Sequence, residues 1–290
     1  MKKVMLGVVL CLFLATFSFS MGFSLKLTGG AAYITSGDYN NGIEGLNAYY
    51  AASSGPVTGT FSKLSLGMNF GGEFILNIDE SFGIGLGVGY MQFSHDTETI
   101  TGTGIFGTVN TWTLKPTVTS IPITLNVHYT LPLGGVNLNL FAGVGYYISK
   151  VKVDSSQSLW SGLLLTSSNA FTSNSIGGQF GFQGGLGLEI PLGGNFSFVA
   201  DITGRYVSLK DIKGDYTISG ISIFTIPLPS VSGTDQYYYA YEHSYSGTWY
   251  KVIGMSTDVS KPSGMTNRNV AHGTFDLTGV SGQAGFKIGF

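Results

Sequence analysis

The stretch FGIGLGVGYMQF, residues 82–93, alternates two kinds of residue along its length. Large apolar residues stand at the even positions from 82 to 90, and glycines stand at the odd positions from 83 to 89. A repeat of two residues is that of a β-strand, because successive side chains of a strand point to opposite faces. The stretch therefore predicts a strand with one apolar face and one face that carries almost no side chains.

The same alternation recurs along most of the chain, and no segment with the period of a helix competes with it. Outside the opening stretch it is clearest at 64–78, where even positions are apolar, and at 121–131, where odd positions are apolar. The fold class predicted is all-β. The eight expected strands are 23–36, 64–78, 82–95, 121–131, 136–148, 180–190, 196–206 and 280–290.

The composition places these strands in a membrane. Only 10% of the 290 residues are charged, against about 25% in an ordinary soluble domain, and mean hydropathy is positive. A bilayer admits only helices or closed barrels, and the expected strands meet the 9–11 residues that a span needs. We therefore predict a transmembrane antiparallel up-and-down β-barrel whose apolar row faces lipid. The net charge of −2 excludes the basic surface of a nucleic-acid-binding protein.

The N-terminus has the pattern of a secretory signal peptide over residues 1–22. Lys2 and Lys3 precede an apolar run that extends to Phe17, and the small residues that follow suit cleavage after residue 20 or 22. The single cysteine, Cys11, lies inside this run, so a processed chain of residues 23–290 would contain no thiol.

Short and long connections alternate strictly. Turn-like residues occupy 79–81, 132–135 and 192–195, whereas the segments 37–59, 96–113, 154–173 and 211–271 are long and polar. This order predicts a meander with short turns at one end and long extracellular loops at the other. An alternative stays open: 216–228 and 236–255 would form another membrane hairpin, which gives ten strands and a wider lumen.

In each expected strand, the positions that alternate with the outward apolar residues face inward, and most of the charged residues stand at these positions. We call this odd or even placement along a strand its parity. A buried charge needs a partner, so the inward charges predict a salt-bridged network that closes a narrow lumen. A narrow polar channel is the alternative. Inward glycines would leave room for bulky residues such as Phe141, Tyr147 and Arg205. The expected lumen residues are Lys26, Glu73, His128, Glu189, Asp201, Arg205 and Lys287.

No motif in the sequence supports a cofactor, a metal or a catalytic site. GTGIFG at 102–107 matches a dinucleotide-binding pattern in letters alone, since no helical period follows it. The histidines lack metal-ligand spacing. His95 beside Asp96, and His243 between Glu242 and Ser244, are adjacent residues whose side chains would point to opposite faces of a strand. We therefore do not expect an enzyme.

The segment QYYYAYEHSYSGTWY, 236–250, carries six tyrosines and a tryptophan within the longest loop. Such aromatic surfaces are enriched at recognition sites, although an aromatic belt at the membrane surface is the competing interpretation. The residues expected in an interaction patch are Tyr237, Tyr239, Tyr241, Tyr245 and Trp249.

Three segments, 120–153, 184–209 and 279–290, resemble the small outer-membrane β-barrel proteins that include the OmpA barrel and OmpW-like proteins. The closing residues Phe286, Ile288 and Phe290 look like the C-terminal signal that the barrel-assembly machinery reads in that family. The resemblance implies a monomer in the cell outer membrane. Implied partners are outer-membrane lipids and lipopolysaccharide, periplasmic chaperones during biogenesis, and an extracellular partner bound through loops. We expect a structural and surface-interaction role; a porin-like channel or transporter for small solutes or hydrophobic compounds is the alternative.

Overall fold

The computed structural model describes residues 22–290 apart from 105–106, 162–163, 223–225 and 257–264. The predicted signal peptide, except for Gly22, lies outside the described residues. The described residues form one helix, and it lacks the length and apolarity that crossing a membrane requires.

Strands make up most of the described chain. In chain order the elements are β1 (Gly22–Ile34), α2 (Gly37–Ser53), β2 (Val57–Thr58), β3 (Leu66–Asn77), β4 (Phe82–Ser94), β5 (Glu98–Thr103), β6 (Thr108–Pro132), β7 (Asn137–Ser161), β8 (Leu164–Gly193), β9 (Phe196–Tyr206), β10 (Ser208–Leu209), β11 (Lys213–Ser222), β12 (Ile226–Tyr245), β13 (Thr248–Ser256), β14 (Asn267–His272), β15 (Phe275–Asp276) and β16 (Gly279–Gly289).

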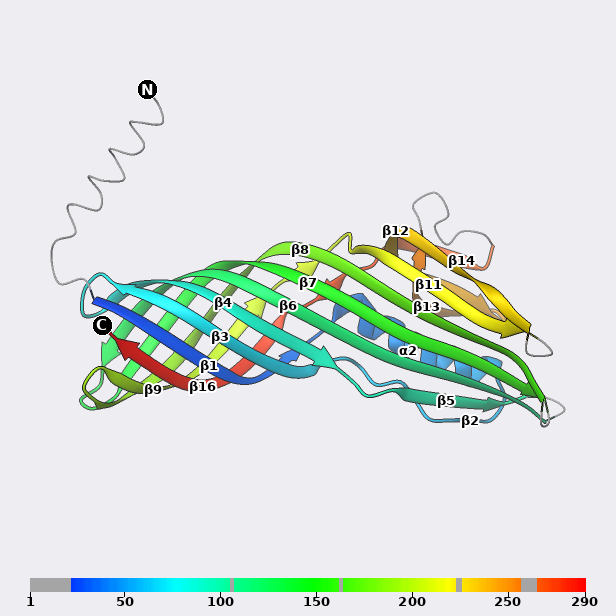
Figure 1. Cartoon of the computed structure of the whole chain (residues 1–290), viewed down its shortest axis with the longest axis horizontal. Coiled ribbons are helices and arrows are strands. Elements are labelled where there is room, and N and C mark those ends of the chain that lie inside the picture. The colour runs from blue at the N-terminus through cyan, green and yellow to red at the C-terminus, as the bar shows by residue number, and fades with distance from the viewer. Residues whose placement is uncertain (1–21, 105–106, 162–163, 223–225, 257–264) are drawn as a thin grey trace, which may run out of the picture.

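Eight of these strands close into a ring, as the alternation predicts (Figure 1). Antiparallel pairing runs through β1, β3, β4, β6, β7, β8, β9 and β16. The last strand then pairs with the first, with Leu25 opposite Ile288. The ring has no free edge, so its backbone groups are satisfied without water. The turns at 79–81, 132–135 and 192–195 join strands of this ring, as expected.

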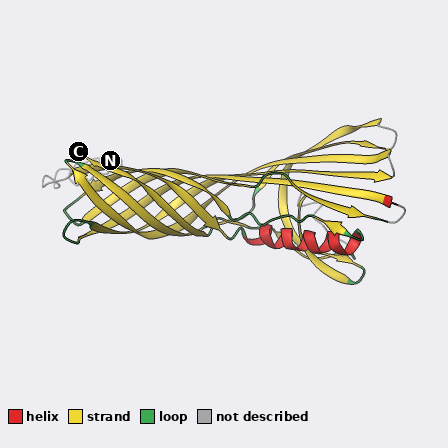
Figure 2. Cartoon of the chain, turned by 90° about the horizontal axis from the view of Figure 1, so that it is seen from below, coloured by secondary structure: helices red, strands yellow, loops and turns green. Residues whose placement is uncertain are grey.

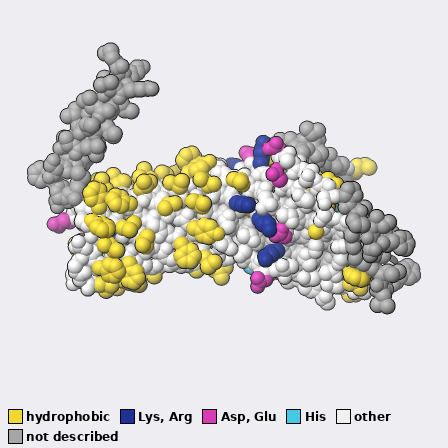
Figure 3. Space-filling view, in the orientation of Figure 1, with side chains coloured by type: hydrophobic (Ala, Val, Ile, Leu, Met, Phe, Trp, Pro, Cys, Tyr) yellow, Lys and Arg dark blue, Asp and Glu magenta, His cyan; other side chains and the backbone are white. Residues whose placement is uncertain are grey.

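The outer face of the ring carries the apolar row. Leu86 is 61% exposed and Ile202 is 67% exposed, and Figure 3 shows apolar side chains spread over the visible face of the barrel. A charged band borders the apolar surface in the same view. Along β6 and β7 the apolar row ends at the pair Ile121 and Ile148, and Lys150 lies two residues further along β7. This change in the outer face is that of a surface leaving hydrocarbon for water.

Beyond the ring, β6, β7 and β8 continue as a long sheet (Figure 2). We call this part of the molecule the extension; it also includes the elements that join the sheet, which are α2, β2, β5 and β11–β14. The expected long loops are therefore mostly regular structure. The segment 96–113 contains β5 and the start of β6, and 154–173 is a hairpin between β7 and β8. The ten-strand alternative is not realised, because β11 and β12 pair with each other and with β8 outside the ring.

The prediction that no helix is present was wrong, because α2 occupies most of the expected loop 37–59. Its inward residues do follow a helical period, at i, i+4, i+7 and i+11. The stripe is hard to recognise because the other faces of the helix are also rich in small residues rather than charges. The stripe consists of Tyr39, Ile43, Leu46 and Tyr50.

Two asparagines and a glycine hold α2 beneath the sheet. Asn40 and Asn47, two helical turns apart, each exchange a pair of hydrogen bonds with the backbone of Leu64 and Phe61 at 2.8–3.2 Å. On another side of the helix, a Cβ atom on Gly45 would collide with the backbone of Lys251 in β13. A glycine is needed there because the helix backbone touches the strand.

Candidate functional site

The centre of the lumen is organised by Lys26, which enters from β1. Its Nζ lies 3.1 Å from a carboxylate oxygen of Glu73 in β3 and 3.2 Å from one of Asp201 in β9. All three side chains are buried in the barrel. The ammonium group therefore offsets two carboxylates at once, which reduces the cost of enclosing them.

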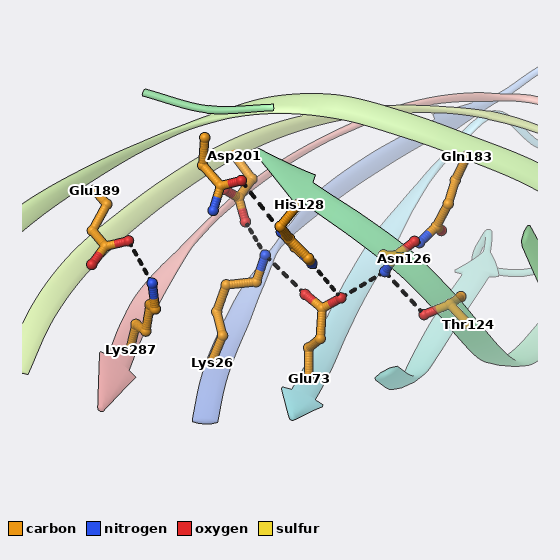
Figure 4. A network of polar contacts seen from close by, with 10 residues as sticks. Lys26, Glu73, Thr124, Asn126, His128, Gln183, Glu189, Asp201 and Lys287 are labelled. Atoms are coloured by element: carbon orange, nitrogen blue, oxygen red, sulfur yellow. Dashed lines mark hydrogen bonds and ion pairs between the residues drawn. The ribbon is translucent and has the colours of Figure 1, made fainter. Parts of the chain in front are cut away.

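A chain of polar side chains extends this network across the lumen (Figure 4). The other carboxylate oxygen of Glu73 accepts a hydrogen bond of 2.7 Å from Asn126 and lies 2.9 Å from Nε2 of His128. Gln183 donates to Asn126 at 2.8 Å and accepts from the Tyr147 hydroxyl at 3.1 Å. Strands from both sides of the ring are thus linked by hydrogen bonds.

Two expected lumen residues form a separate ion pair, and one stands apart. Lys287, which stands opposite Lys26 in the pairing of β16 with β1, donates to Glu189 at 2.8 Å (Figure 4). Arg205 is buried, but its Nε and Nη2 have no hydrogen-bond partner among the described residues; Nη1 contacts the sulfur of Met91. The expectation that Arg205 belongs to the salt-bridged network was therefore wrong. Six of the seven predicted residues make ion pairs inside the barrel, whereas Arg205 makes its only polar contact among the described residues with the sulfur of Met91.

The glycine row of β4 makes room for this network. A Cβ atom on Gly85 would collide with the Glu73 carboxylate and lie 2.8 Å from His128 Nε2, and one on Gly87 would lie 2.6 Å from the Thr124 hydroxyl. The space is filled by neighbouring strands. Of the bulky residues expected over glycines, Phe141 faces Gly185 and Tyr147 faces Gly145.

An apolar layer lies above the polar network of the lumen. Five inward-facing residues are each at most 1% exposed and belong to one cluster, which we call the seal: Ile34, Met91, Phe93, Val118 and Tyr147. The sequence analysis missed this layer. Its signal was present in the opening stretch, where the apolar residues change from even positions, ending at Tyr90, to the odd positions of Met91 and Phe93.

Above the seal, the inward face of the long strands becomes apolar and their outward face becomes polar, which is the reverse of the arrangement in the ring. In β6 the inward row changes from His128 and Asn126 within the ring to Leu114 and Trp112 in the extension. A strand keeps its parity when it leaves the membrane. Because water now bathes the outer face, the apolar residues must lie on the inner one.

The inner face of the extension and helix α2 line a cavity of about 550 Å³ that opens to solvent at Gln157 and Asn169. Its wall combines the apolar stripe of α2 with the inward residues of β6, β7, β8 and β12. Tyr50 of the helix stacks on Trp112 with ring centroids 4.2 Å apart. Burial raises the pKa of Tyr50 to about 12 and that of Tyr238, on the opposite wall, to about 12. Both phenols are therefore neutral at physiological pH.

The five residues predicted as an interaction patch do not form one exposed surface. Tyr239 is 2% exposed, and Tyr237 stacks on His272 with ring centroids 4.5 Å apart. Tyr241 is half-buried, and burial raises its pKa. Tyr245 contacts Tyr49 of α2, and Trp249 lies under the guanidinium of Arg268 at 4.1 Å. These aromatic rings mainly pack β12–β14 and α2 together.

The closing residues of the chain lie on the lipid-facing side of the last strand. Phe286 stacks on Phe196 of β9 with ring centroids 5.1 Å apart, and Phe290 is exposed. The backbone of Phe290 pairs with that of Phe23, so both ends of the barrel chain meet. A role of Phe286, Ile288 and Phe290 as an assembly signal stays a prediction.

Comparison with known proteins places this architecture in a family. The sequence model of one protein family, described as the outer membrane protein beta-barrel domain, matches residues 8–224, which is about three quarters of the chain. The chain belongs to this family. It is an outer-membrane β-barrel protein. Short turns in such barrels lie on the periplasmic side, so we expect the end that carries the extension to be the extracellular one.

Two solved structures are similar over almost the whole length. The outer membrane protein OprG from Pseudomonas aeruginosa shares 12% identity, with 93% of this chain and 96% of that chain covered and a TM-score of 0.38. A major outer membrane protein from Thermus thermophilus shares 15% identity, with 93% and 100% covered and a TM-score of 0.35. No curated protein matches the chain significantly.

Proposed function

We propose that this protein is a closed outer-membrane barrel with a structural role in the envelope, and that its extension is the part that interacts with the cell's surroundings. The position of Lys26 between Glu73 and Asp201 carries the proposal, because it fixes three strands of the lumen together. The apolar seal supports it from above, since its residues are fully buried. The proposed role is non-catalytic.

Recording from planar bilayers tests whether the barrel is closed. Refolded protein is expected to give no stable single-channel steps. A variant that opens both barriers, with Lys26→Ala, Met91→Gly and Phe93→Gly combined, should conduct, which shows that the assay detects an open lumen. Large, stable steps from the unmodified protein would contradict the proposal.

A second candidate function is a narrow channel for small solutes, and Arg205 favours it. The residue borders a lumen cavity of about 80 Å³, and two of its nitrogens have no hydrogen-bond partner in the described part of the chain. A buried guanidinium without a partner attracts water or an anion. If the lumen conducts, Arg205→Ala should change ion selectivity, whereas Lys150→Ala on the outer face should not.

We also propose that the charged band contacts lipopolysaccharide. Lys115 and Lys150 are exposed on the outward rows of β6 and β7, beyond the last apolar pair. Lysines at this level face the phosphate groups of the outer leaflet. Replacing both with glutamate should lower the melting temperature in vesicles that contain lipopolysaccharide but not in phosphatidylcholine vesicles. Equal changes in both lipids would contradict this contact.

A further inference from the structure

We propose that the cavity of the extension binds an uncharged small molecule with a flat apolar body and a hydrogen-bonding group at one end. This inference deepens the proposed function and rests on its claim that the extension is the interacting part. The site lies above the seal, and none of its described lining residues borders the lumen cavity at Arg205.

The size of the cavity is the first argument. Its volume of about 550 Å³ lies within the 300–1,000 Å³ of typical ligand sites. The extension also has a packed core that adjoins this space, including Phe61 and Tyr238, which are at most 7% exposed. A space of this size bordered by fixed side chains is preformed, so a ligand would bind without a large cost in ordering the protein.

The aromatic end of the cavity, at Trp112, determines the shape of the ligand. Trp112 and Tyr50 stack with an interplanar angle of 25°, and Tyr39 and Ile43 line the same space two to three helical turns earlier on α2. Aromatic rings favour offset stacking with another flat ring. A flat apolar body therefore fits this end better than a branched chain.

The same end of the cavity also supplies hydrogen bonds, because Gln157 pairs directly with Trp112 across β6 and β7. Gln157 of β7 and Asn169 of β8 stand opposite each other on the inward face, and both are exposed. Ser155 follows on the same row as Gln157. These amide and hydroxyl groups can donate to or accept from a hydroxyl or carbonyl group of a ligand. The polar group of the ligand would therefore point toward solvent.

The charge of the ligand follows from the wall as well. None of the described lining residues is Asp, Glu, Lys, Arg or His. An ionised ligand would lose its hydration without gaining a counter-charge, and this costs several kcal/mol. An uncharged ligand avoids that cost.

The test uses prodan, an uncharged naphthalene that bears a carbonyl group and accepts excitation energy from tryptophan. Full-length refolded protein is held in an amphipathic polymer, with Trp160→Phe and Trp249→Phe leaving Trp112 as the donor. We expect saturable energy transfer from Trp112 to prodan. The anionic naphthalene dye anilinonaphthalene sulfonate should bind at least tenfold more weakly; equal binding of the two dyes would overturn the proposed ligand class.

Matched variants on one strand locate the site. Val153→Phe combined with Ser155→Phe fills the inward face and should weaken prodan binding at least tenfold. Lys152→Phe combined with Asp154→Phe places the same rings on the outer face and should leave binding unchanged. Equal affinity in both double variants would overturn the proposal.

A single, smaller substitution tests the same site with less risk that the variant misfolds. Gln157→Leu at the mouth should weaken prodan binding about fivefold, and unchanged binding would count against the assigned orientation of the ligand. Heat-modifiable migration on gels confirms a folded barrel for each variant. Conductance of the same preparations separates the two claims: channel activity with intact binding contradicts only the closed barrel, and no binding by a non-conducting protein contradicts only the ligand site.

Discussion

The carboxylate of Glu73 occupies the space that a side chain at Gly85 would need. The two residues lie on neighbouring strands, and the same space is bordered by Nε2 of His128. The glycine row of β4 therefore leaves the space that the polar network of the lumen occupies. These glycines are required because side chains of neighbouring strands pack directly against them, and not because the strand itself needs glycine.

Gly85→Ala should destabilise the barrel by about 1–3 kcal/mol, because the added methyl group overpacks the network. Gly71→Ala is the matched control: it lies on the inward row of β3, and its Cβ atom would meet its nearest neighbour at 3.7 Å. Urea unfolding in lipid vesicles measures both. Similar stability of the two variants would show that the lumen adapts to a methyl group at position 85.

Lys26→Met should cost about 3 kcal/mol of stability, since it leaves Glu73 and Asp201 buried without a counter-charge. Lys287→Met is expected to cost less, because Lys287 has the single partner Glu189. Vesicle unfolding curves give both values. Adding Glu73→Gln and Asp201→Asn to Lys26→Met should restore most of the loss, and a failure of this rescue would argue against an electrostatic cause.

Gly45→Ala should displace α2, although the same change stabilises an exposed helix by about 1 kcal/mol. The methyl group would collide with the backbone of Lys251. Because Tyr50 would then leave Trp112, the emission of Trp112 should shift in a protein that lacks the other two tryptophans. Ala51→Gly, at an exposed position of the same helix, should leave the emission unchanged.

Packing of the β12–β14 pair should weaken in acid. Hydrogen bonding to Arg268 at 2.6 Å, aided by its charge and by Asn269, lowers the pKa of Glu242 below its ordinary value of 4.5. A lowered pKa in the folded state means that the stabilisation is present above pH 4.5 and is lost as the pH falls through the lowered pKa. Trp249, under Arg268, should report this change in fluorescence.

Glu242→Gln is the control for that titration. The amide carries no charge to be neutralised, so the acid transition of Trp249 should disappear while the neutral-pH spectrum is retained. An unaltered transition in this variant would assign the pH dependence to another group.

Much of the barrel could be predicted from one chemical rule applied along the chain. Alternation determines where a strand lies and which way each side chain points, and hydrocarbon on one side requires the apolar row outside. The inward direction of Lys26, Glu73 and Asp201 follows from parity alone. The eight-strand ring, the three short turns and the outward exposure of residues such as Ile84 follow from the same pattern.

Pairing and three-dimensional packing decided the rest. Lys26 meets Asp201 because closure of the ring pairs β16 with β1 and leaves β9 one strand further on. The two residues are 175 positions apart in the sequence. No local pattern encodes such a contact, and Arg205 shows that inward parity does not guarantee a partner. The helix escaped prediction because small residues on its other faces conceal the apolar stripe, which is recognised only once the inner face of the extension lies against it. The cavity exists because strands that leave the membrane keep their parity while water replaces lipid outside them, so the apolar side chains gather on the inner face, where α2 covers them.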